Sequence, residues 1–166
     1  MKKYKTLIMI PTFNEKGNVD KLCTSLRKIA PECDILFVDD NSPDGTGELL
    51  DQLSKNNPFI SVMHRKGRQG VGSAHGAGIN KAYSRGYELL ITMDADFTHS
   101  PEYISEFIKM AEFKNIVVGS RYLKNNSLPE WNPLRKSLTL IAHVLTTALL
   151  DLKYDSTGAF RAYRLD

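Results

Sequence analysis

Short apolar runs and longer amphipathic stretches alternate along the first 120 residues of the chain. The apolar runs have the length of strands buried on both faces, whereas the amphipathic stretches repeat their apolar residues every three or four positions, as helices do. The predicted strands are residues 6–10, 34–38, 59–64, 88–93 and 116–119, and the predicted helices are residues 18–30, 46–55 and 73–85 and a segment opened by Pro101. This alternation predicts an α/β fold, Rossmann-like, with a mostly parallel central sheet and helices on both faces.

The pattern changes after Ser120. Residues 121–133 show no periodicity, so a long loop is expected there. Residues 134–152 predict a helix whose apolar side chains nearly encircle it, and residues 157–164 alternate like a strand. The helix is too short and too interrupted by polar residues to cross a membrane. It fits a core or dimer helix as well as a helix that lies beside a lipid.

Composition places the chain among ordinary globular domains. Its 166 residues are 42% hydrophobic and 25% charged, which excludes disorder and fibrous repeats and predicts a single domain over residues 1–166. The net charge of +3 is too small to indicate a nucleic-acid partner. Cys23 and Cys33 are too few for a disulfide framework, and no apolar run is long enough for a signal peptide or a membrane span. A cytoplasmic chain is therefore expected.

Acidic residues follow two of the predicted strands directly. Asp39 and Asp40 end the second strand, and Asp94 and Asp96 follow the fourth. The carboxyl ends of parallel strands meet at one edge of a sheet, where ligands bind. Two carboxylates on one short turn repel each other unless a divalent cation lies between them, and such cations prefer oxygen ligands. We therefore expect Asp94 and Asp96 to bind a metal; the alternative is that these acids only cap a turn or a helix.

A glycine-rich segment over residues 67–73 resembles two phosphate-binding motifs but fits neither. Ser73 stands where the P-loop requires lysine, and His75 stands where a dinucleotide fingerprint requires its third glycine. What remains is a strand-to-helix turn, next to Arg68, that allows a ligand to approach the backbone. The histidines form no catalytic constellation, although His99 follows the acidic turn and could line the site. Gly76 and Gly78 are expected to allow close packing of their helix.

The charge of the chain becomes basic after Ser120. Arginine side chains suit phosphate oxygens, although a solvated basic face explains such residues equally well. Arg121 differs from the others because it immediately follows a predicted strand and should reach the same edge as the acids. The site should therefore combine acids for a metal with arginines for an anion.

The motifs, taken in their order along the chain, resemble those of the inverting family 2 glycosyltransferases, which have the nucleotide-sugar-binding GT-A fold. Within that family they are most similar to the dolichol-phosphate (polyprenol monophosphate) mannose synthases. The matching stretches are Pro11-Thr12-Phe13-Asn14-Glu15, Val38 to Thr46, Gly70-Val71-Gly72, Met93-Asp94-Ala95-Asp96, Gly119-Ser120-Arg121-Tyr122, Trp131 with Arg135, and Asp155 to Arg161. The resemblance extends over essentially the whole chain. It implies that residues 1–100 bind the nucleotide sugar and the metal and that residues 101–166 bind the acceptor. The acceptor half is expected to be cut short at its C-terminus.

The resemblance also implies roles for individual residues. The nucleotide sugar would be bound by Pro11, Phe13, Glu15, Val38, Asp40, Asp94, Ala95, Asp96 and Arg121. The metal, Mg²⁺ or Mn²⁺, would be bound by Asp94 and Asp96. Many relatives place glutamine as a further metal ligand where this chain has Thr98, whose hydroxyl would act through a bridging water. The acceptor phosphate would be bound by Arg121, Arg135, Thr139, Arg161 and Arg164. Asp94, Asp96 and Arg121 are the expected catalytic residues.

The activity implied by the resemblance is transfer of mannose from GDP-mannose to dolichyl or polyprenyl phosphate, with inversion, at a membrane surface. A phosphate acceptor already carries negative charge at pH 7 and needs no general base, which fits the arginine-rich second half. Two alternatives stay open. One is a transferase that moves glucose or an N-acetylhexosamine from a UDP-sugar to a polyprenyl phosphate or a glycan. The other is a catalytically incomplete fragment that binds nucleotide sugar.

Overall fold

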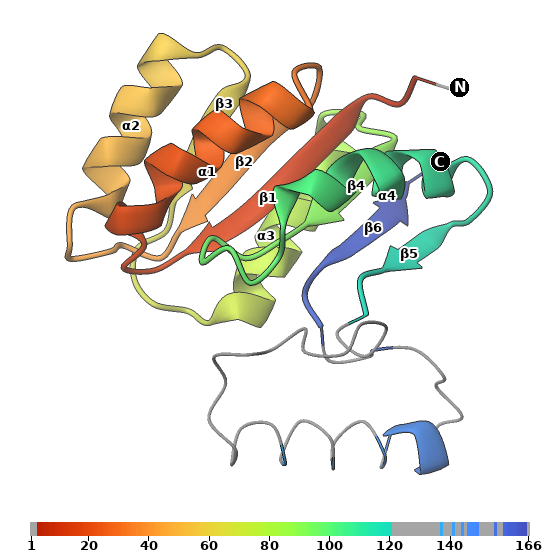
Figure 1. Cartoon of the computed structure of the whole chain (residues 1–166). Helices are drawn as coiled ribbons and strands as arrows, with labels where there is room; N and C mark the ends of the chain where they lie inside the picture. Colours follow the sequence, from red (N-terminus) through yellow and green to blue (C-terminus); the bar gives the residue numbers. More distant parts are fainter. Residues whose placement is uncertain are drawn as a thin grey trace. The chain divides into compact units, whose positions relative to one another are not determined.

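The computed structural model describes residues 3–120, 137, 141, 144, 146–149, 155 and 158–165. The chain forms two compact units. The first contains residues 1–117 and 160–166, and the second contains residues 118–159. The sheet and the helices that surround it belong almost entirely to the first unit (Figure 1).

Strands and helices alternate in the first unit as the apolar pattern predicts. The elements are β1 (Thr6–Thr12), α1 (Lys16–Ile29), β2 (Asp34–Asp39), α2 (Thr46–Asn56), β3 (Ile60–His64), α3 (Val71–Ser84), β4 (Leu89–Thr92), a 3-10 turn η1 (Pro101–Tyr103), α4 (Ile104–Ala111), β5 (Ile116–Val118) and β6 (Arg161–Arg164). Both α1 and α3 begin two residues before their predicted starts. Gly70 precedes α3 with a φ of 87°, a conformation that glycine adopts readily.

Within the described residues, the strands form one sheet in the order β3-β2-β1-β4-β6-β5. β1 pairs in parallel with β2 and β4, and β2 pairs in parallel with β3, so these four strands end at the same edge. β6 is antiparallel to β4, and Arg161 at its start lies opposite Thr92 at the end of β4. The predicted mostly parallel sheet with helices on both faces is confirmed, and its carboxyl edge receives the loops that follow β1, β2, β3 and β4.

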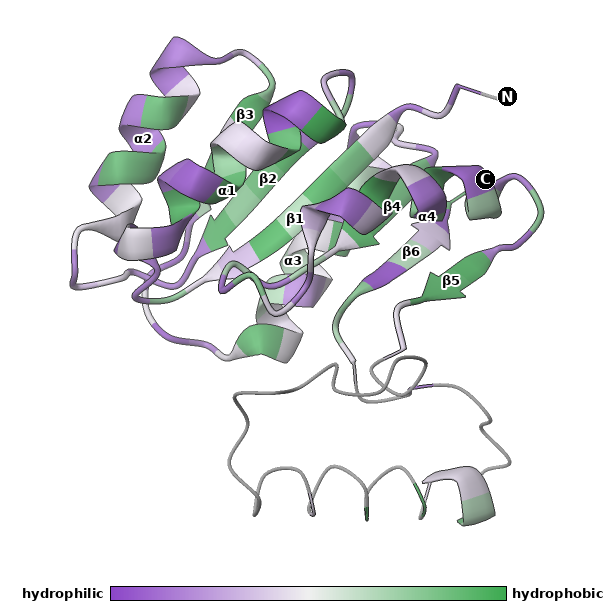
Figure 2. Cartoon of the chain, viewed as in Figure 1, coloured by the Kyte–Doolittle hydropathy of each residue, from purple (hydrophilic) through white to green (hydrophobic). Residues whose placement is uncertain are grey.

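The sheet separates two hydrophobic cores, because successive side chains of a strand point to opposite faces. Ile8 and Ile10 of β1 pack on the side of α1, α2 and α4, whereas Leu7 and Met9 pack on the side of α3. The strands are correspondingly apolar along most of their length, while the helices show hydrophilic outer faces (Figure 2). This double burial explains why the strands read as continuous apolar runs in the sequence.

The described residues of the second unit are few. Ser137, Ile141, Val144 and residues 146–149 are helical, within the segment predicted as a helix. Asp155 is buried, and its Oδ1 accepts the N–H of Gly158 at 3.2 Å. None of the described helices is long and apolar enough to cross a membrane.

Gly78 allows α3 to lie close to β1. A Cβ atom at this position would lie 2.5 Å from Cγ of Met9, whereas a Cβ atom at Gly76 would meet nothing within 4 Å. Met9 is fully buried and therefore has little room to move. The expectation of close packing is confirmed for Gly78 and wrong for Gly76, which occupies an exposed position of the same helix.

These two glycines form a matched pair for a stability test. Alanine is a better helix former than glycine by up to about 1 kcal/mol, so Gly76→Ala should be neutral or stabilising. Gly78→Ala gains the same propensity but crowds Met9, and such crowding typically costs about 1 to 3 kcal/mol. We expect urea denaturation to show Gly78→Ala less stable than Gly76→Ala by roughly that amount. Equal midpoints would contradict the close approach of α3 to β1.

Candidate functional site

The loops at the carboxyl edge of the sheet carry unusual backbone conformations. Among the described residues, three that are not glycine have positive φ, namely Asn14 (61°), Asn41 (57°) and Phe97 (61°). They follow β1, β2 and β4 respectively, and so all three lie at the edge where the parallel strands end. Asparagine tolerates this conformation, but for a bulky side chain such as Phe97 it is costly and concentrates at functional sites. The turn after β4 is therefore held in shape by its surroundings.

Two sets of hydrogen bonds hold that turn, which carries Asp94, Ala95 and Asp96. The backbone N–H of Asp94 donates to Nδ1 of His99 at 3.0 Å. Oδ1 of Asp96 accepts the backbone N–H of Thr98 at 3.0 Å and its hydroxyl at 2.6 Å. Ala95 is buried, while the side chain of Asp94 is 39% exposed and Asp96 is exposed. The turn thus presents two carboxylates to solvent from a fixed backbone.

The donor set of this turn fits a divalent cation that is shared with a substrate. Two carboxylates are the usual protein contribution to a Mg²⁺ ion that takes its other oxygens from phosphates and water. Both hydrogen bonds from Thr98 end on Oδ1 of Asp96, and neither of them involves Oδ2. No group of three or more His, Cys, Asp or Glu side chains suited to a metal occurs within the described part of the chain. A cation here would therefore depend on oxygen atoms from a ligand. Thr98 orients Asp96, and its predicted contact with the metal through water stays a prediction.

Arg161 and His75 lie at the same place as the acidic turn. Arg161 pairs with Thr92, two residues before Asp94 in the chain. His75, on the first turns of α3, interacts electrostatically with both Asp94 and Arg161. Burial lowers the pKa of His75; the charge of Asp94 opposes this shift, and that of Arg161 adds to it. His75 is consequently neutral at pH 7, so Arg161 supplies positive charge there and His75 does not.

The structure does not bring Arg164 to this site. Arg164 lies opposite Leu89, at the start of β4, whereas Arg161 lies at the end of β4. The two arginines are three residues apart on a strand, which separates them by about 10 Å and directs them to opposite faces. The expectation that Arg164 binds the acceptor phosphate together with Arg161 is therefore corrected: Arg161 alone of the two lies beside the acidic turn.

The residues expected to bind the nucleotide lie along the ends of β1 and β2. Pro11 and Val38 are direct partners in the parallel ladder. The guanidinium of Arg68 lies over the ring of Phe13, 4.6 Å from its centre, so the glycine-rich segment after β3 reaches the loop after β1. The backbone N–H of Glu15 donates to the hydroxyl of Thr46, and its carboxylate accepts the amide of Asn18. Pro11, Phe13, Glu15 and Val38 therefore lie at the carboxyl ends of β1 and β2, and Arg68 reaches them from the segment after β3. These residues are called the rim of the site.

Asp40 is held by a partner that the sequence reasoning missed. Arg65, directly after β3, forms an ion pair through Nε with Oδ1 of Asp40 and donates to the hydroxyl of Ser73 at 2.8 Å and the carbonyl of Gly70 at 3.2 Å. The backbone N–H of Gln69 donates to the other oxygen of Asp40 at 3.1 Å. Burial opposes ionisation of Asp40, but the hydrogen bonds from Arg65 and Gln69 and the charge of Arg65 outweigh it and lower its pKa.

Asp39 has a structural role rather than a ligand-binding one. It is 2% exposed, and its carboxylate accepts hydrogen bonds from the hydroxyl of Thr12 and from the backbone and hydroxyl of Ser42. Asp44 accepts the backbone N–H and the hydroxyl of Thr46 at the start of α2, as expected of a capping residue. Of the acids after β2, Asp39 and Asp44 therefore hold the turn in shape, whereas Asp40 lies at the rim of the site.

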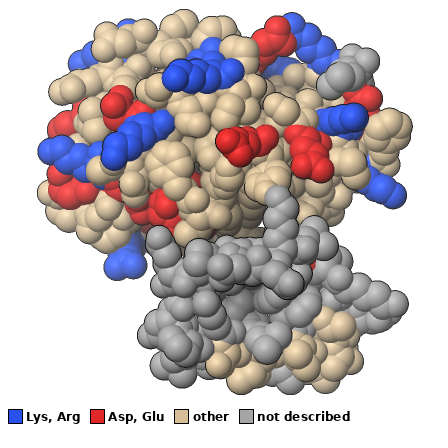
Figure 3. Space-filling view, viewed as in Figure 1, with Lys and Arg blue, Asp and Glu red and all other residues tan. Residues whose placement is uncertain are grey.

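Three expected site residues, Arg121, Arg135 and Thr139, lie outside the described residues, as does most of the predicted helix 134–152. Over the described face shown in Figure 3, positive and negative side chains are interspersed rather than gathered into one basic patch.

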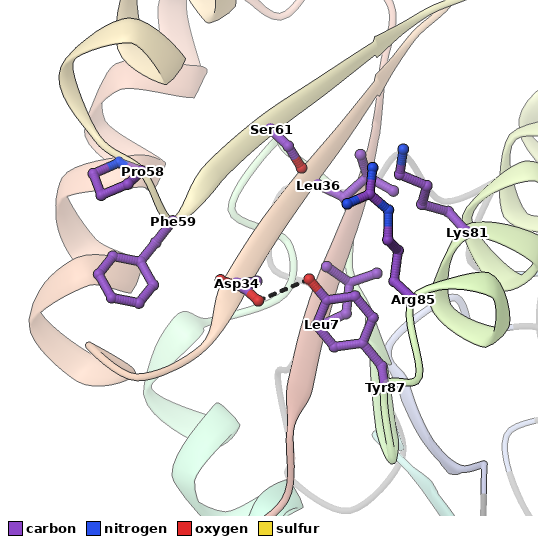
Figure 4. Close-up of a pocket in the computed structure, with 9 residues that line it drawn as sticks. All are labelled: Leu7, Asp34, Leu36, Pro58, Phe59, Ser61, Lys81, Arg85 and Tyr87. Atoms are coloured by element: carbon purple, nitrogen blue, oxygen red, sulfur yellow. Dashed lines mark hydrogen bonds between the residues drawn. The ribbon is translucent and has the colours of Figure 1, made fainter.

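A separate hollow of about 230 Å³ lies at the opposite edge of the sheet, near the starts of β1, β2 and β3 (Figure 4). Lys81 of α3 and Arg85, the residue after this helix, line it, and the hydroxyl of Tyr87 donates to Oδ2 of Asp34 at 2.7 Å. Burial and this hydrogen bond raise the pKa of Tyr87. None of the predicted site residues lines the hollow, which separates it from the chemistry at the carboxyl edge.

Comparison with known proteins places the chain in a family. The family model described as "Glycosyl transferase family 2" matches residues 7–166. The undecaprenyl-phosphate mannosyltransferase of Micrococcus luteus is 36% identical over 163 residues, which are 98% of this chain and 67% of that protein. The polyprenol monophosphomannose synthase of Mycolicibacterium smegmatis is 37% identical over 163 residues, which are 96% of this chain and 62% of that protein. The chain spans about two thirds of the length of these relatives.

Solved structures share the fold. The glucosyl-3-phosphoglycerate synthase of Mycobacterium tuberculosis, crystallised with Mn²⁺, UDP and phosphoglyceric acid, has a TM-score of 0.69 at 16% identity and covers 97% of this chain and 56% of its own. The mannosyltransferase PcManGT of Pyrobaculum calidifontis, in complex with GDP-Man and Mn²⁺, has a TM-score of 0.52 at 19% identity and covers 57% of this chain and 28% of its own. At these identities the likeness shows the fold alone.

Proposed function

This chain belongs to glycosyl transferase family 2, and from that premise we propose that it transfers mannose from GDP-mannose to a polyprenyl phosphate, with inversion at the anomeric carbon. The two relatives described above are named as a mannosyltransferase and a monophosphomannose synthase, with undecaprenyl phosphate and polyprenol monophosphate in those names. The GT-A fold expected from the motifs is confirmed by the family match and the shared fold. One observation carries the proposal most directly: Arg161 lies beside the turn that bears Asp94 and Asp96.

The donor would bind along the rim formed by the ends of β1 and β2. Pro11, Phe13, Glu15, Val38 and Asp40 would contact the nucleotide, and Arg68 lies close enough to Phe13 to contribute. Asp40 retains acceptor capacity after binding Arg65 and Gln69, because each carboxylate oxygen can accept more than one hydrogen bond. Asp94 and Asp96, beside buried Ala95, would hold Mg²⁺ or Mn²⁺ against the diphosphate.

The chemistry follows from the charges on the two sides of the anomeric carbon. A divalent cation bound at this site would offset the negative charge that develops on the leaving diphosphate. Arg161 would bind the acceptor phosphate, with Arg121, Arg135 and Thr139 as further predicted contacts. A phosphate monoester carries a charge of about −1.5 to −2 at pH 7 and can attack without a general base.

The acceptor would bring the protein to a membrane. A polyprenyl phosphate presents its phosphate at the membrane surface, so we propose that the chain acts on the cytoplasmic face as a peripheral protein. The apolar segment 134–152 is the part of the chain expected to approach the lipid. Its role stays a prediction.

A transfer assay tests the proposal. We expect purified protein to form lipid-linked mannose from GDP-mannose and a short polyprenyl phosphate in the presence of Mn²⁺, and to form none in EDTA. The matched control is the same polyprenol without its phosphate, which should give no product because its hydroxyl would need a base. Transfer from UDP-glucose instead would favour a UDP-sugar enzyme. Binding of either donor without product would favour a chain that binds nucleotide sugar only.

A further inference from the structure

His99 connects the acidic turn to a distant part of the chain. Its ring is buried, with 9% of its side chain exposed, and lies stacked on the ring of Phe160 with 5.0 Å between centres and 14° between planes. Phe160 in turn packs edge-on against Phe107 of α4, with 4.4 Å between centres. The imidazole is therefore fixed on one side by aromatic rings that come from α4 and from the residue before β6.

The other side of the imidazole contacts the turn. Nδ1 of His99 accepts the backbone N–H of Asp94 at 3.0 Å, which requires Nδ1 to carry no hydrogen. The same nitrogen lies 3.7 Å from Oδ2 of Asp94, too far for a hydrogen bond. His99 thus contacts the backbone of the turn and leaves the carboxylate of Asp94 to point elsewhere.

The turn needs such support because its backbone is strained. Phe97 lies between Asp96 and Thr98 with a φ of 61°, a conformation that costs a bulky residue free energy. Thr98 supports only the Asp96 end of the turn, through the carboxylate. At the Asp94 end, the backbone N–H of Asp94 donates to the ring of His99. Removal of that acceptor would leave the first carboxylate free to change its direction.

We propose that His99 is a positioning residue, which holds Asp94 and Asp96 in the geometry that binds the divalent cation, and that Phe160 fixes His99 for this purpose. The inference rests on the proposed function for the identity of the ligand. It also explains why aromatic Phe160 directly precedes Arg161: the same short segment orients the metal-binding turn through His99 and carries the arginine expected at the acceptor phosphate. A shift of this segment would disturb both sides of the reaction together.

Two substitutions at His99 separate the hydrogen bond from the ring. His99→Phe keeps a ring to stack on Phe160 but loses the acceptor, whereas His99→Asn loses the stacked ring but can place an amide oxygen near the position of Nδ1. Mn²⁺ binding to the full chain would be measured by electron paramagnetic resonance in the presence of GDP, corrected for GDP alone, and thermal unfolding would be measured in parallel. We expect His99→Phe to weaken Mn²⁺ binding about 10- to 100-fold, as is usual when a residue that orients a metal ligand is lost. His99→Asn should recover a large part of this loss.

The results that overturn the inference are equally specific. A folded His99→Phe variant that binds Mn²⁺ like the wild type, or a His99→Asn variant no better than His99→Phe, would exclude a role through the hydrogen bond. Wild-type protein that binds no Mn²⁺ beyond GDP alone would also overturn it. If His99→Phe does not fold, Phe160→Leu decides: it keeps the nitrogen acceptor but removes the stacked ring, and unchanged Mn²⁺ affinity would contradict the proposal. Mn²⁺ binding that follows these expectations without any sugar transfer would reject the proposed function and leave the inference standing.

Discussion

Asp96→Ala is expected to lower the rate of mannosyl transfer by roughly 10³-fold or more and to leave the protein folded. A metal ion that stabilises a leaving group contributes several kcal/mol to the transition state, and about 1.4 kcal/mol corresponds to a factor of ten in rate. Asp96 is exposed, and its described hydrogen bonds are to Thr98, which is also exposed, so its loss should leave both hydrophobic cores unchanged. Initial rates with GDP-mannose, polyprenyl phosphate and Mn²⁺, together with thermal unfolding, test both parts of this expectation.

The matched control is Glu106→Ala, which removes an exposed carboxylate from α4, away from the turn. This variant should keep wild-type activity and stability, because it changes the net charge by the same amount without touching the site. Activity of Asp96→Ala within tenfold of the wild type would contradict a metal role for this carboxylate. Equal losses in both variants would point to a general effect of charge.

Arg65→Met should give the largest loss of stability among single substitutions at the rim of the site. The side chains of Arg65 and Asp40 are 7% and 8% exposed, so the substitution leaves the Asp40 carboxylate buried without its ionic partner. Removal of one partner from a buried ion pair typically costs about 3 to 5 kcal/mol. Arg65 also binds Ser73 and the carbonyl of Gly70, so the glycine-rich segment should loosen as well. Urea denaturation at pH 7 measures the loss, and Lys66→Met, at the next, exposed position, should change stability by less than about 0.5 kcal/mol.

The dependence of this loss on pH provides a second check. In the wild type, the pKa of Asp40 is lowered on folding, so ionised Asp40 stabilises the fold above the unfolded pKa near 4, and this contribution is lost as the pH falls through the lower folded pKa. Without Arg65, burial is left with fewer opposing contacts and should raise the pKa of Asp40. The variant should therefore be most impaired near pH 7 and approach the wild type below about pH 4. A deficit that is constant over this range would mean that lost packing, rather than the charge, causes it.

The parts of the fold that the sequence predicts are those set by local patterns. The apolar runs identify β1, β2 and β4 because few polar residues interrupt a strand that is buried on both faces. The direction of β6 could not be predicted, because the alternation in residues 157–164 is the same for a parallel and an antiparallel strand. That direction decides that Arg161 lies beside the acidic turn and Arg164 does not. The conformation expected for residues 121–136 stays a prediction, since the structure does not describe them.

At the site, the residues missed are those whose partners are distant in the sequence. His75 gave no local signal, since only the sheet brings α3 close to Asp94 and Arg161. Likewise, nothing in the sequence near His99 indicates that Phe160 stacks on it. Arg65 could have been found, because it directly follows β3 and an arginine at that position should reach the carboxyl edge of the sheet.

The place of β6 between β4 and β5 has a consequence for how the protein folds during synthesis. Strands β1 to β4 can pair as soon as they leave the ribosome, but β4 then has one unpaired edge until residues 161–164 arrive. An unpaired strand edge invites association with other chains. Closure of the sheet requires the ends of the 118–159 segment to be brought together first, at an entropic cost that grows only slowly with length. The sheet of the nascent chain is therefore vulnerable to aggregation over an interval fixed by the translation of about forty residues, and slower translation of that segment should lower the yield of native protein.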